Sequence, residues 1–349
     1  MSYKKFITAG ILSVFFILGS CLDNGNPTND NEDPSDTLVT PIDTTDTNAI
    51  PIDTADTNST PVDTLKGSTY GTFLIKLIPE NPATEDPAFT RIYGTITDGP
   101  SPPNIIFKEV MSSGTCKLMK AISPFCEDDC GGLGYKCVAD DVCMAEPKVI
   151  NVGSITVTGL KRNGSAVPIT MEPPNSLYYQ MIGEPLDYPP VTEGDTITLS
   201  ATGHDSIQPF TIKTRGITPL VVLNDEILVE DGKPITINWV PPTIAGVSKI
   251  YIRINISYHG GTKGEIQYEC DDNGSATIPG EMLDKLKSYG IAGYPLVDIT
   301  RKSISSDPDA NAKIIVECTI TKLLTIPGVH SCDQDEDCPG QLCIDRRCQ

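Results

Sequence analysis

Residues 250–258 read Ile-Tyr-Ile-Arg-Ile-Asn-Ile-Ser-Tyr, and this stretch decides the fold class. The residues at even positions, from Ile250 to Tyr258, alternate strictly with a second set that contains Tyr251, Arg253 and Asn255. Successive side chains of a β-strand point to opposite faces of the sheet. The alternation therefore predicts a half-buried antiparallel strand whose even positions face the core.

Similar runs with a period of two recur along the chain after Gly67, separated by proline, glycine and asparagine turns. They are Phe73-Ile75-Leu77, Ile155-Val157, Ile197-Leu199-Ala201, Ile235-Ile237-Trp239 and Ile314-Val316-Cys318-Ile320. Eight or more short strands at this spacing predict a mainly β protein, with an antiparallel β-sandwich or barrel-like domain. One short helix is predicted after Pro279, with Met282, Leu283 and Leu286 on its buried side and Gly290 at its end.

The N-terminal residues have the pattern of an export signal. Lys4 and Lys5 precede an apolar run from Phe6 to Leu18, which is typical of a signal peptide. The tetrapeptide Leu-Gly-Ser-Cys at 18–21 resembles the lipobox of bacterial lipoproteins. The resemblance implies cleavage before Cys21, attachment of acyl chains to this cysteine, and membrane anchoring.

Two other interpretations of the N-terminus remain open. A plain secretory peptide would end at Ser20, and a retained transmembrane anchor would keep the apolar run, although thirteen apolar residues are few for a bilayer span. Under the sorting rule of some Gram-negative lipoproteins, Leu22 after the lipidated cysteine favours the outer membrane. We therefore expect a membrane-anchored protein at the outer membrane or cell surface.

The segment between Cys21 and residue 69 has almost no large apolar side chains. It contains a ten-residue repeat that begins at Pro41, Pro51 and Pro61, and residues 22–66 hold ten acidic residues and one lysine, a net charge of -9. Such a composition cannot bury enough surface to fold. We expect a disordered, extended tether at 21–69. Its threonines are alternatively O-glycosylation sites, since Asp-Thr followed by a small or apolar residue resembles such sites in some bacterial surface proteins.

The remaining chain divides by its cysteines. A β-rich domain is expected at 70–327, with a cysteine-rich insertion at 114–146, and a C-terminal cysteine-rich module at 328–349. An exported chain favours disulfides over thiols. The disulfide candidates are Cys116, Cys126, Cys130, Cys137, Cys143, Cys270, Cys318, Cys332, Cys338, Cys343 and Cys348.

Eleven candidates are an odd number, so at least one thiol stays free or pairs with another chain. Two arrangements fit the count. In the first, Cys270 completes the early cluster and Cys318 stays a buried thiol; in the second, Cys270 bridges to Cys318 and one early cysteine is spare. The four C-terminal cysteines allow three pairings.

Two stretches resemble known proteins. The run from Cys332 to Cys348 is similar to the cysteine-rich repeats of bacterial surface lipoproteins that are matched to the Dickkopf N-terminal domain. Gly114–Leu118, Pro124–Cys126 and Cys130–Gly132, with later segments at 239–242 and 270–279, resemble uncharacterised cysteine-rich lipoproteins. Neither resemblance implies an activity.

Candidate sites for ligands are few. Tyr178, Tyr179 and Tyr188 lie in a proline-rich loop and are the expected carbohydrate platform, if one exists. Asp333, Asp335 and Asp337 alternate as calcium ligands do, but cysteine and proline replace the required glycine turn, so solvated acids are the favoured interpretation. Asp271–Gly274 is interpreted as a turn rather than as a cation site. His204-Asp205 is interpreted as a solvated turn.

Function follows as an expectation. A net charge of -20 argues against a nucleic-acid partner, and the absence of catalytic motifs argues against an enzyme. No cofactor and no catalytic residue are predicted. We expect a non-catalytic lipoprotein that binds or contacts a surface protein or polysaccharide. A carbohydrate-binding accessory protein and a secreted hydrolase are the alternatives.

Overall fold

The computed structural model describes residues 70–81, 85–173, 179–258, 261–332, 334–344 and 347–348. Contacts divide the chain into two units, Met1–Thr60 and Pro61–Gln349, and every described residue belongs to the second. This unit is mainly β, as predicted. The predicted signal peptide and the whole of the predicted tether at 21–69, including Cys21, lie outside the described residues.

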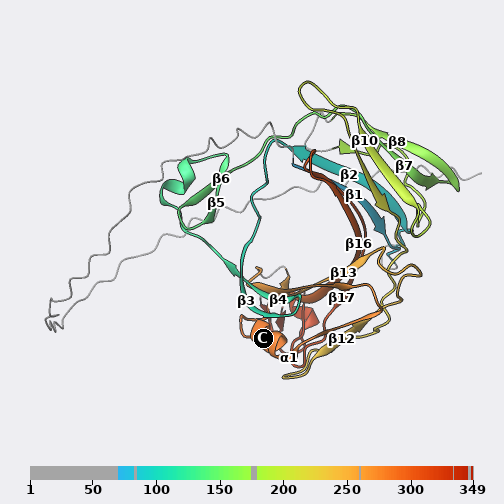
Figure 1. Ribbon diagram of the computed structural model, residues 1–349. Coiled ribbons are helices and arrows are strands. Elements are labelled where there is room, and N and C mark those ends of the chain that lie inside the picture. The colour runs from blue at the N-terminus through green and yellow to red at the C-terminus, as the bar shows by residue number, and fades with distance from the viewer. Residues whose placement is uncertain are drawn as a thin grey trace, which may run out of the picture. The chain divides into compact units, whose positions relative to one another are not determined.

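A nine-stranded sheet forms the centre of the unit. Figure 1 shows this sheet curving from β1 and β2 through β16 and β13 to β4 and β3. In spatial order its strands are β3 (Ile106–Ser113), β4 (Cys116–Ile122), β14 (Gly264–Asp271), β13 (Lys249–Tyr258), β16 (Tyr294–Asp307), β17 (Ala312–Leu323), β1 (Tyr70–Ile78), β2 (Phe89–Thr97) and β9 (Tyr179–Gln180). All neighbours are antiparallel except β1 and β17, which run parallel.

Smaller sheets complete the unit. The second sheet contains β11 (Phe210–Arg215), β10 (Thr196–Ala201), β7 (Ile155–Arg162) and β8 (Ser165–Met171). Three two-stranded sheets pair β12 (Ile235–Asn238) with β15 (Ser275–Ile278), β5 (Tyr135–Ala139) with β6 (Val142–Ala145), and β18 (Cys343–Ile344) with β19 (Arg347–Cys348). Short 3-10 turns lie at η1 (Glu127–Gly131) and η2 (Asp335–Asp337).

Burial on the inner face of the central sheet follows the predicted alternation. Phe73, Ile75 and Leu77 of β1 are fully buried. The predicted inward residues of β17 and β7 are fully buried too: Ile314, Val316 and Cys318, and Ile155 and Val157. They join the apolar residues of the second sheet in one continuous core. Strand β11 packs against β16 and β17, where Thr214 Oγ1 lies 3.2 Å from Ser303 Oγ.

The helix α1 (Gly280–Lys287) confirms its prediction. Pro279 is its N-cap residue, Met282, Leu283 and Leu286 are buried, and Gly290 follows with φ +99°. The helix contacts β14, and the Cys116 thiol of β4 lies 3.5 Å from the Met282 sulfur. This short helix therefore covers the β4–β14 end of the inner face.

The alternation in β13 ends earlier than predicted. Ile250, Ile252 and Ile254 face the core, but Asn255 and Ser257 are also buried and Tyr258 is 43% exposed. A bulge between Asn255 and Tyr258 shifts the register with β16. Since a bulge adds a residue to one strand, the two faces exchange beyond it.

A buried ion pair links the inner face of β16 to three loops, β11–β12, β12–β13 and β14–β15. The five N–H groups of Arg301, which is 1% exposed, donate to Asp272 Oδ2 at 2.6 Å, Asp272 Oδ1 at 3.1 Å and the carbonyls of Val240, Pro219 and Thr218 at 2.6, 3.0 and 3.3 Å. Asp272 also accepts from Trp239 Nε1 and Ser248 Oγ, both at 2.7 Å. No polar group of this pair is left without a partner, which is the condition under which a buried charge is tolerated.

We expect Asp272→Asn to lower the free energy of unfolding by about 3–5 kcal/mol, because it leaves the Arg301 charge buried without its counter-ion. Asp271→Asn is the matched control, since this neighbour is exposed, and should change stability by less than about 0.5 kcal/mol. Urea denaturation followed by tryptophan fluorescence measures both, because Trp239 donates to the Asp272 carboxylate. Equal losses in the two variants would contradict the assignment.

Candidate functional site

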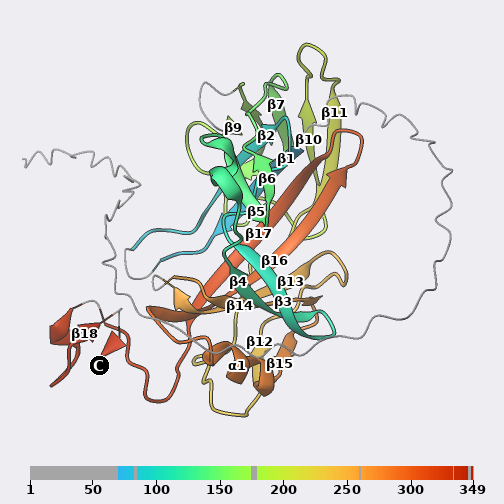
Figure 2. The same ribbon diagram turned by 90° about the vertical axis from the view of Figure 1, so that its left-hand side faces the viewer.

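The outer face of the central sheet carries a groove of about 840 Å³. It runs over six adjacent strands, β4, β14, β13, β16, β17 and β1. Figure 2 shows how β16 and β17 extend as a long pair between the β1–β2 end and the β4–β14 end of the sheet. Many of the lining residues alternate along their strands with core residues. Examples of these lining residues are Lys76, Lys117, Tyr251, Arg253, Asp298 and Thr319.

One cross-strand row of the groove is held by hydrogen bonds to Asp298. Lys117, Gln267, Arg253, Asp298 and Thr321 are consecutive register partners from β4 to β17. Arg253 Nη2 donates to Asp298 Oδ2 at 2.7 Å, and Thr321 Oγ1 donates to Oδ1 at 2.6 Å. Both carboxylate oxygens are thus engaged, and the row has a fixed arrangement of donors and acceptors.

The next row places an aromatic ring and two hydroxyls side by side. Glu269, Tyr251, Thr300 and Thr319 are register partners, and the two threonine oxygens lie 3.0 Å apart. Burial raises the pKa of Tyr251, and the nearby Glu269 carboxylate adds to this effect. The phenol, which is protonated at neutral pH in any case, interacts with the Glu269 carboxylate on the next strand.

Of the tyrosine platform predicted from the sequence, the two described residues, Tyr179 and Tyr188, do not form an exposed pair. Tyr179 is fully buried, accepts a hydrogen bond from Val152 N–H at 3.0 Å, and donates to the carbonyl of Gly153 at 3.0 Å. Tyr188 packs against the core with its hydroxyl 3.7 Å from Cys318 Sγ. Tyr178 lies outside the described residues. The prediction failed for Tyr179 because this residue joins β2 as the short edge strand β9.

Two of the C-terminal aspartates accept hydrogen bonds from nearby backbone N–H groups. Asp335 Oδ1 accepts from the backbone N–H of Cys343 at 2.7 Å, and Asp337 Oδ2 accepts from that of Gln334 at 3.2 Å. Asp333 lies outside the described residues. These contacts cap a disulfide-linked turn, so Asp335 and Asp337 have local hydrogen-bond partners in addition to solvent. His204 and Asp205 form an exposed turn at the bridge between His204 and Ile207.

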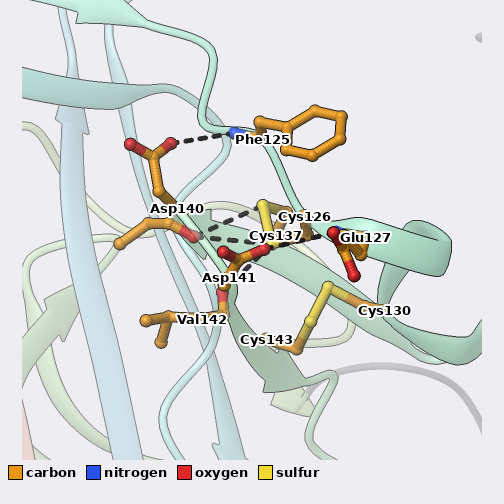
Figure 3. Close-up of a disulfide and its surroundings, with 10 residues drawn as sticks. Phe125, Cys126, Glu127, Cys130, Cys137, Asp140, Asp141, Val142 and Cys143 are labelled. Atoms are coloured by element: carbon orange, nitrogen blue, oxygen red, sulfur yellow. Dashed lines mark hydrogen bonds between the residues drawn. A yellow bond between two sulfur atoms is a disulfide. The ribbon is translucent and has the colours of Figure 1, made fainter.

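Each of the two cysteine-rich segments contains two internal disulfides. Cys126 pairs with Cys137 and Cys130 with Cys143, while Cys332 pairs with Cys343 and Cys338 with Cys348. Figure 3 shows the first pair of bonds, with Phe125 and Val142 on either side of the Cys126–Cys137 bond. Asp140 supports this segment by accepting from the N–H of Phe125 at 3.0 Å.

Cys116, Cys270 and Cys318 are free thiols. Cys318 is a buried thiol, as the first predicted arrangement has it, but Cys270 pairs neither with the early cluster nor with Cys318. Cys116 belongs to β4 of the central sheet rather than to the disulfide-linked segment. Cys270 and Cys318 do share the inner face, but β13 and β16 lie between their strands. Three strand spacings are roughly 14 Å, which no disulfide can span.

Comparisons with known proteins do not identify the chain. No protein-family model matches it, and no curated protein matches it. A crystal structure of a tetra-tandem repeat in the extending region of a large adhesion protein is similar at 12% identity, with a TM-score of 0.18. The match covers 78% of this chain and 79% of that one, and so low a TM-score carries no argument. Within the described residues, no helix has the length and apolar character needed for a membrane span.

We expect the three thiols to be slow to alkylate in the native protein. Burial raises the pKa of Cys116 and of Cys270 to about 11, and that of Cys318 is also raised. At pH 8 the reactive thiolate of Cys116 or Cys270 is then on the order of 0.1% of the total, and it increases as the pH rises toward 11. Mass spectrometry of the iodoacetamide-treated Cys21→Ser chain should find three labels in denaturant and far slower labelling without it. Rapid labelling of Cys116 in the native chain at pH 8 would contradict its burial.

Proposed function

We propose that the chain is a lipoprotein, anchored through Cys21 at the outer membrane or cell surface, that acts by binding a surface ligand in the groove of its central sheet. The export signal and lipobox-like sequence at 1–21 support the anchor, and the acidic segment 22–69 would act as the spacer. The groove supports the binding role.

The observation that carries the proposal is the outer face of the sheet itself. The groove gathers hydrogen-bonding side chains from six strands onto a rigid support, with Tyr251 among them. Binding sites on strands are held more precisely than sites on loops. Paired donors and acceptors on such a support suit recognition of a polar ligand.

The groove acids suit binding better than catalysis. Asp298 is bonded to Arg253, Glu269 accepts from Lys249 at 2.7 Å, and Glu317 lies 3.3 Å from Lys302. A catalytic carboxyl group needs an environment that lets it exchange a proton, for example an apolar pocket. Carboxylates held by cations instead provide fixed hydrogen-bond acceptors. We therefore propose binding rather than hydrolysis.

The anchor is tested by Cys21→Ser. Because the acyl chains attach to this sulfur, we expect the variant to move from the membrane fraction to the soluble fraction. Intact mass of the unaltered protein extracted from membranes should show a chain that starts at Cys21 and carries acyl groups. Unaltered protein that keeps its first twenty residues and carries no acyl mass would support an uncleaved anchor instead.

The groove is tested by Tyr251→Ala in the full Cys21→Ser chain. We expect at least tenfold weaker binding to isolated envelopes of the producing cells, measured by cosedimentation, because the aromatic contact surface in the groove is removed. Tyr258→Ala is the matched control, since Tyr258 lies on the same strand but does not line the groove. Equal binding by both variants would place the binding surface elsewhere.

A further inference from the structure

A third row of side chains crosses the outer face beside Tyr251, and it is mostly cationic. Six register partners follow one another over six adjacent strands, from β2 to β14: Arg91, Lys76, Glu317, Lys302, Lys249 and Asp271. Four of the six are basic, in a chain whose net charge is -20. We call Arg91, Lys76, Lys302 and Lys249 the cation row.

The cation row breaks the usual rule for cross-strand pairs. Lys76 lies directly opposite Arg91, and Lys249 lies directly opposite Lys302. Like charges in such positions destabilise a sheet. Departures from a local stability rule are expected where a surface has a binding role.

The acids near the row neutralise only one end of it. Lys249 donates to Glu269 at 2.7 Å, and Lys302 lies 3.3 Å from Glu317. Among the described residues, no carboxylate lies within ion-pair distance of Lys76 or Arg91, although Lys76 is a register partner of Glu317. The Arg91 guanidinium lies 5.2 Å from the Phe89 ring centre. The β1–β2 end of the row thus has two cations that form no ion pair with any described carboxylate.

We propose that the cation row binds a carboxylate-bearing polysaccharide that lies across the strands. This inference rests on the proposed function and names the class of ligand. From Arg91 to Lys249 there are four strand spacings, or about 19 Å, which is the length of several sugar residues. Neighbouring cations of the row are about 4.8 Å apart, except that Lys76 and Lys302 are twice as far apart because Glu317 lies between them. Such spacings match a polymer that carries one charge on each successive sugar.

The neighbouring row explains why the polymer is a carbohydrate. Tyr251 and Thr300 lie two residues along their strands from the cation row, which is roughly 7 Å, and Thr319 is the register partner of Thr300. Lys302 Nζ lies 5.2 Å from the Tyr251 ring centre, so the two rows form one surface. Threonine hydroxyls can exchange hydrogen bonds with sugar hydroxyls, and the tyrosine ring can pack against the apolar face of a sugar.

The experiment is calorimetric titration of the full Cys21→Ser chain with oligogalacturonate, using malto-oligosaccharide of equal length as the neutral probe. We expect binding of the acidic polymer alone, and at least tenfold weaker binding at 0.5 M NaCl than at 0.05 M, because salt screens exposed charges. Lys76→Gln and Arg91→Gln should each reduce affinity at least fivefold. Lys213→Gln is the control, because this lysine is exposed on β11, outside the central sheet.

Thermal unfolding distinguishes a loss of binding from a folding defect in the variants. Removal of one of two like charges should leave the midpoint unchanged or raise it, so weaker binding at an unchanged midpoint supports the proposal. Equal affinity for the neutral polymer, or unchanged affinity in both row variants, would overturn it. If envelope binding still depends on Tyr251 in that case, the proposed function stands and only the acidic ligand is rejected.

The experiment also tests whether the acidic segment before β1, rather than an external polymer, binds the cation row. If weak binding by the chain increases tenfold after five aspartates are replaced with asparagine, the row is filled by its own chain and the proposal is overturned. These aspartates are Asp43, Asp46, Asp53, Asp56 and Asp63. Unchanged affinity after this replacement supports an external ligand.

Discussion

The buried pair of Arg301 and Asp272 is the constraint on which both faces of the central sheet depend. Arg301 lies in the middle of β16 and reaches across the inner face to Asp272 and to three carbonyls. A slip of one residue would turn Arg301 toward solvent and Lys302 toward the core. By fixing the phase of β16, the pair also places Thr300 and Lys302 in the groove.

Local alternation was sufficient to predict the strands but not their order. Ile314, Val316 and Cys318 indicated a half-buried strand, and β17 confirms it. The parallel pairing of β17 with β1 joins residues more than two hundred positions apart, and no local pattern encodes that contact. The same limit explains the cysteines. Cys270 and Cys318 shared a predicted face, yet the two strands between them could not be read from the chain.

The groove was missed for a related reason. Its side chains come from six strands between Lys76 and Thr321, and only the register brings them together. In the sequence, Tyr251 and Arg253 were simply the polar phase of a strand. Tyr179, in contrast, looked exposed because prolines surround it, whereas two hydrogen bonds hold its hydroxyl in the core. An arginine on the inward face of a strand, such as Arg301, indicates a buried ion pair. This indication can be used only after it is known which residues of the strand face inward.

The proposed ligand must satisfy two electrostatic conditions that act over different distances. The charge of -20 repels polyanions at long range, most strongly those with dense charge such as nucleic acids. At physiological ionic strength this repulsion is screened beyond about 8 Å, so a polymer in contact with the cation row responds chiefly to nearby side chains. A polysaccharide with one carboxylate on each sugar has a much lower charge density than DNA. The acidic surface and the cation row together would therefore favour sparsely charged polymers over densely charged ones.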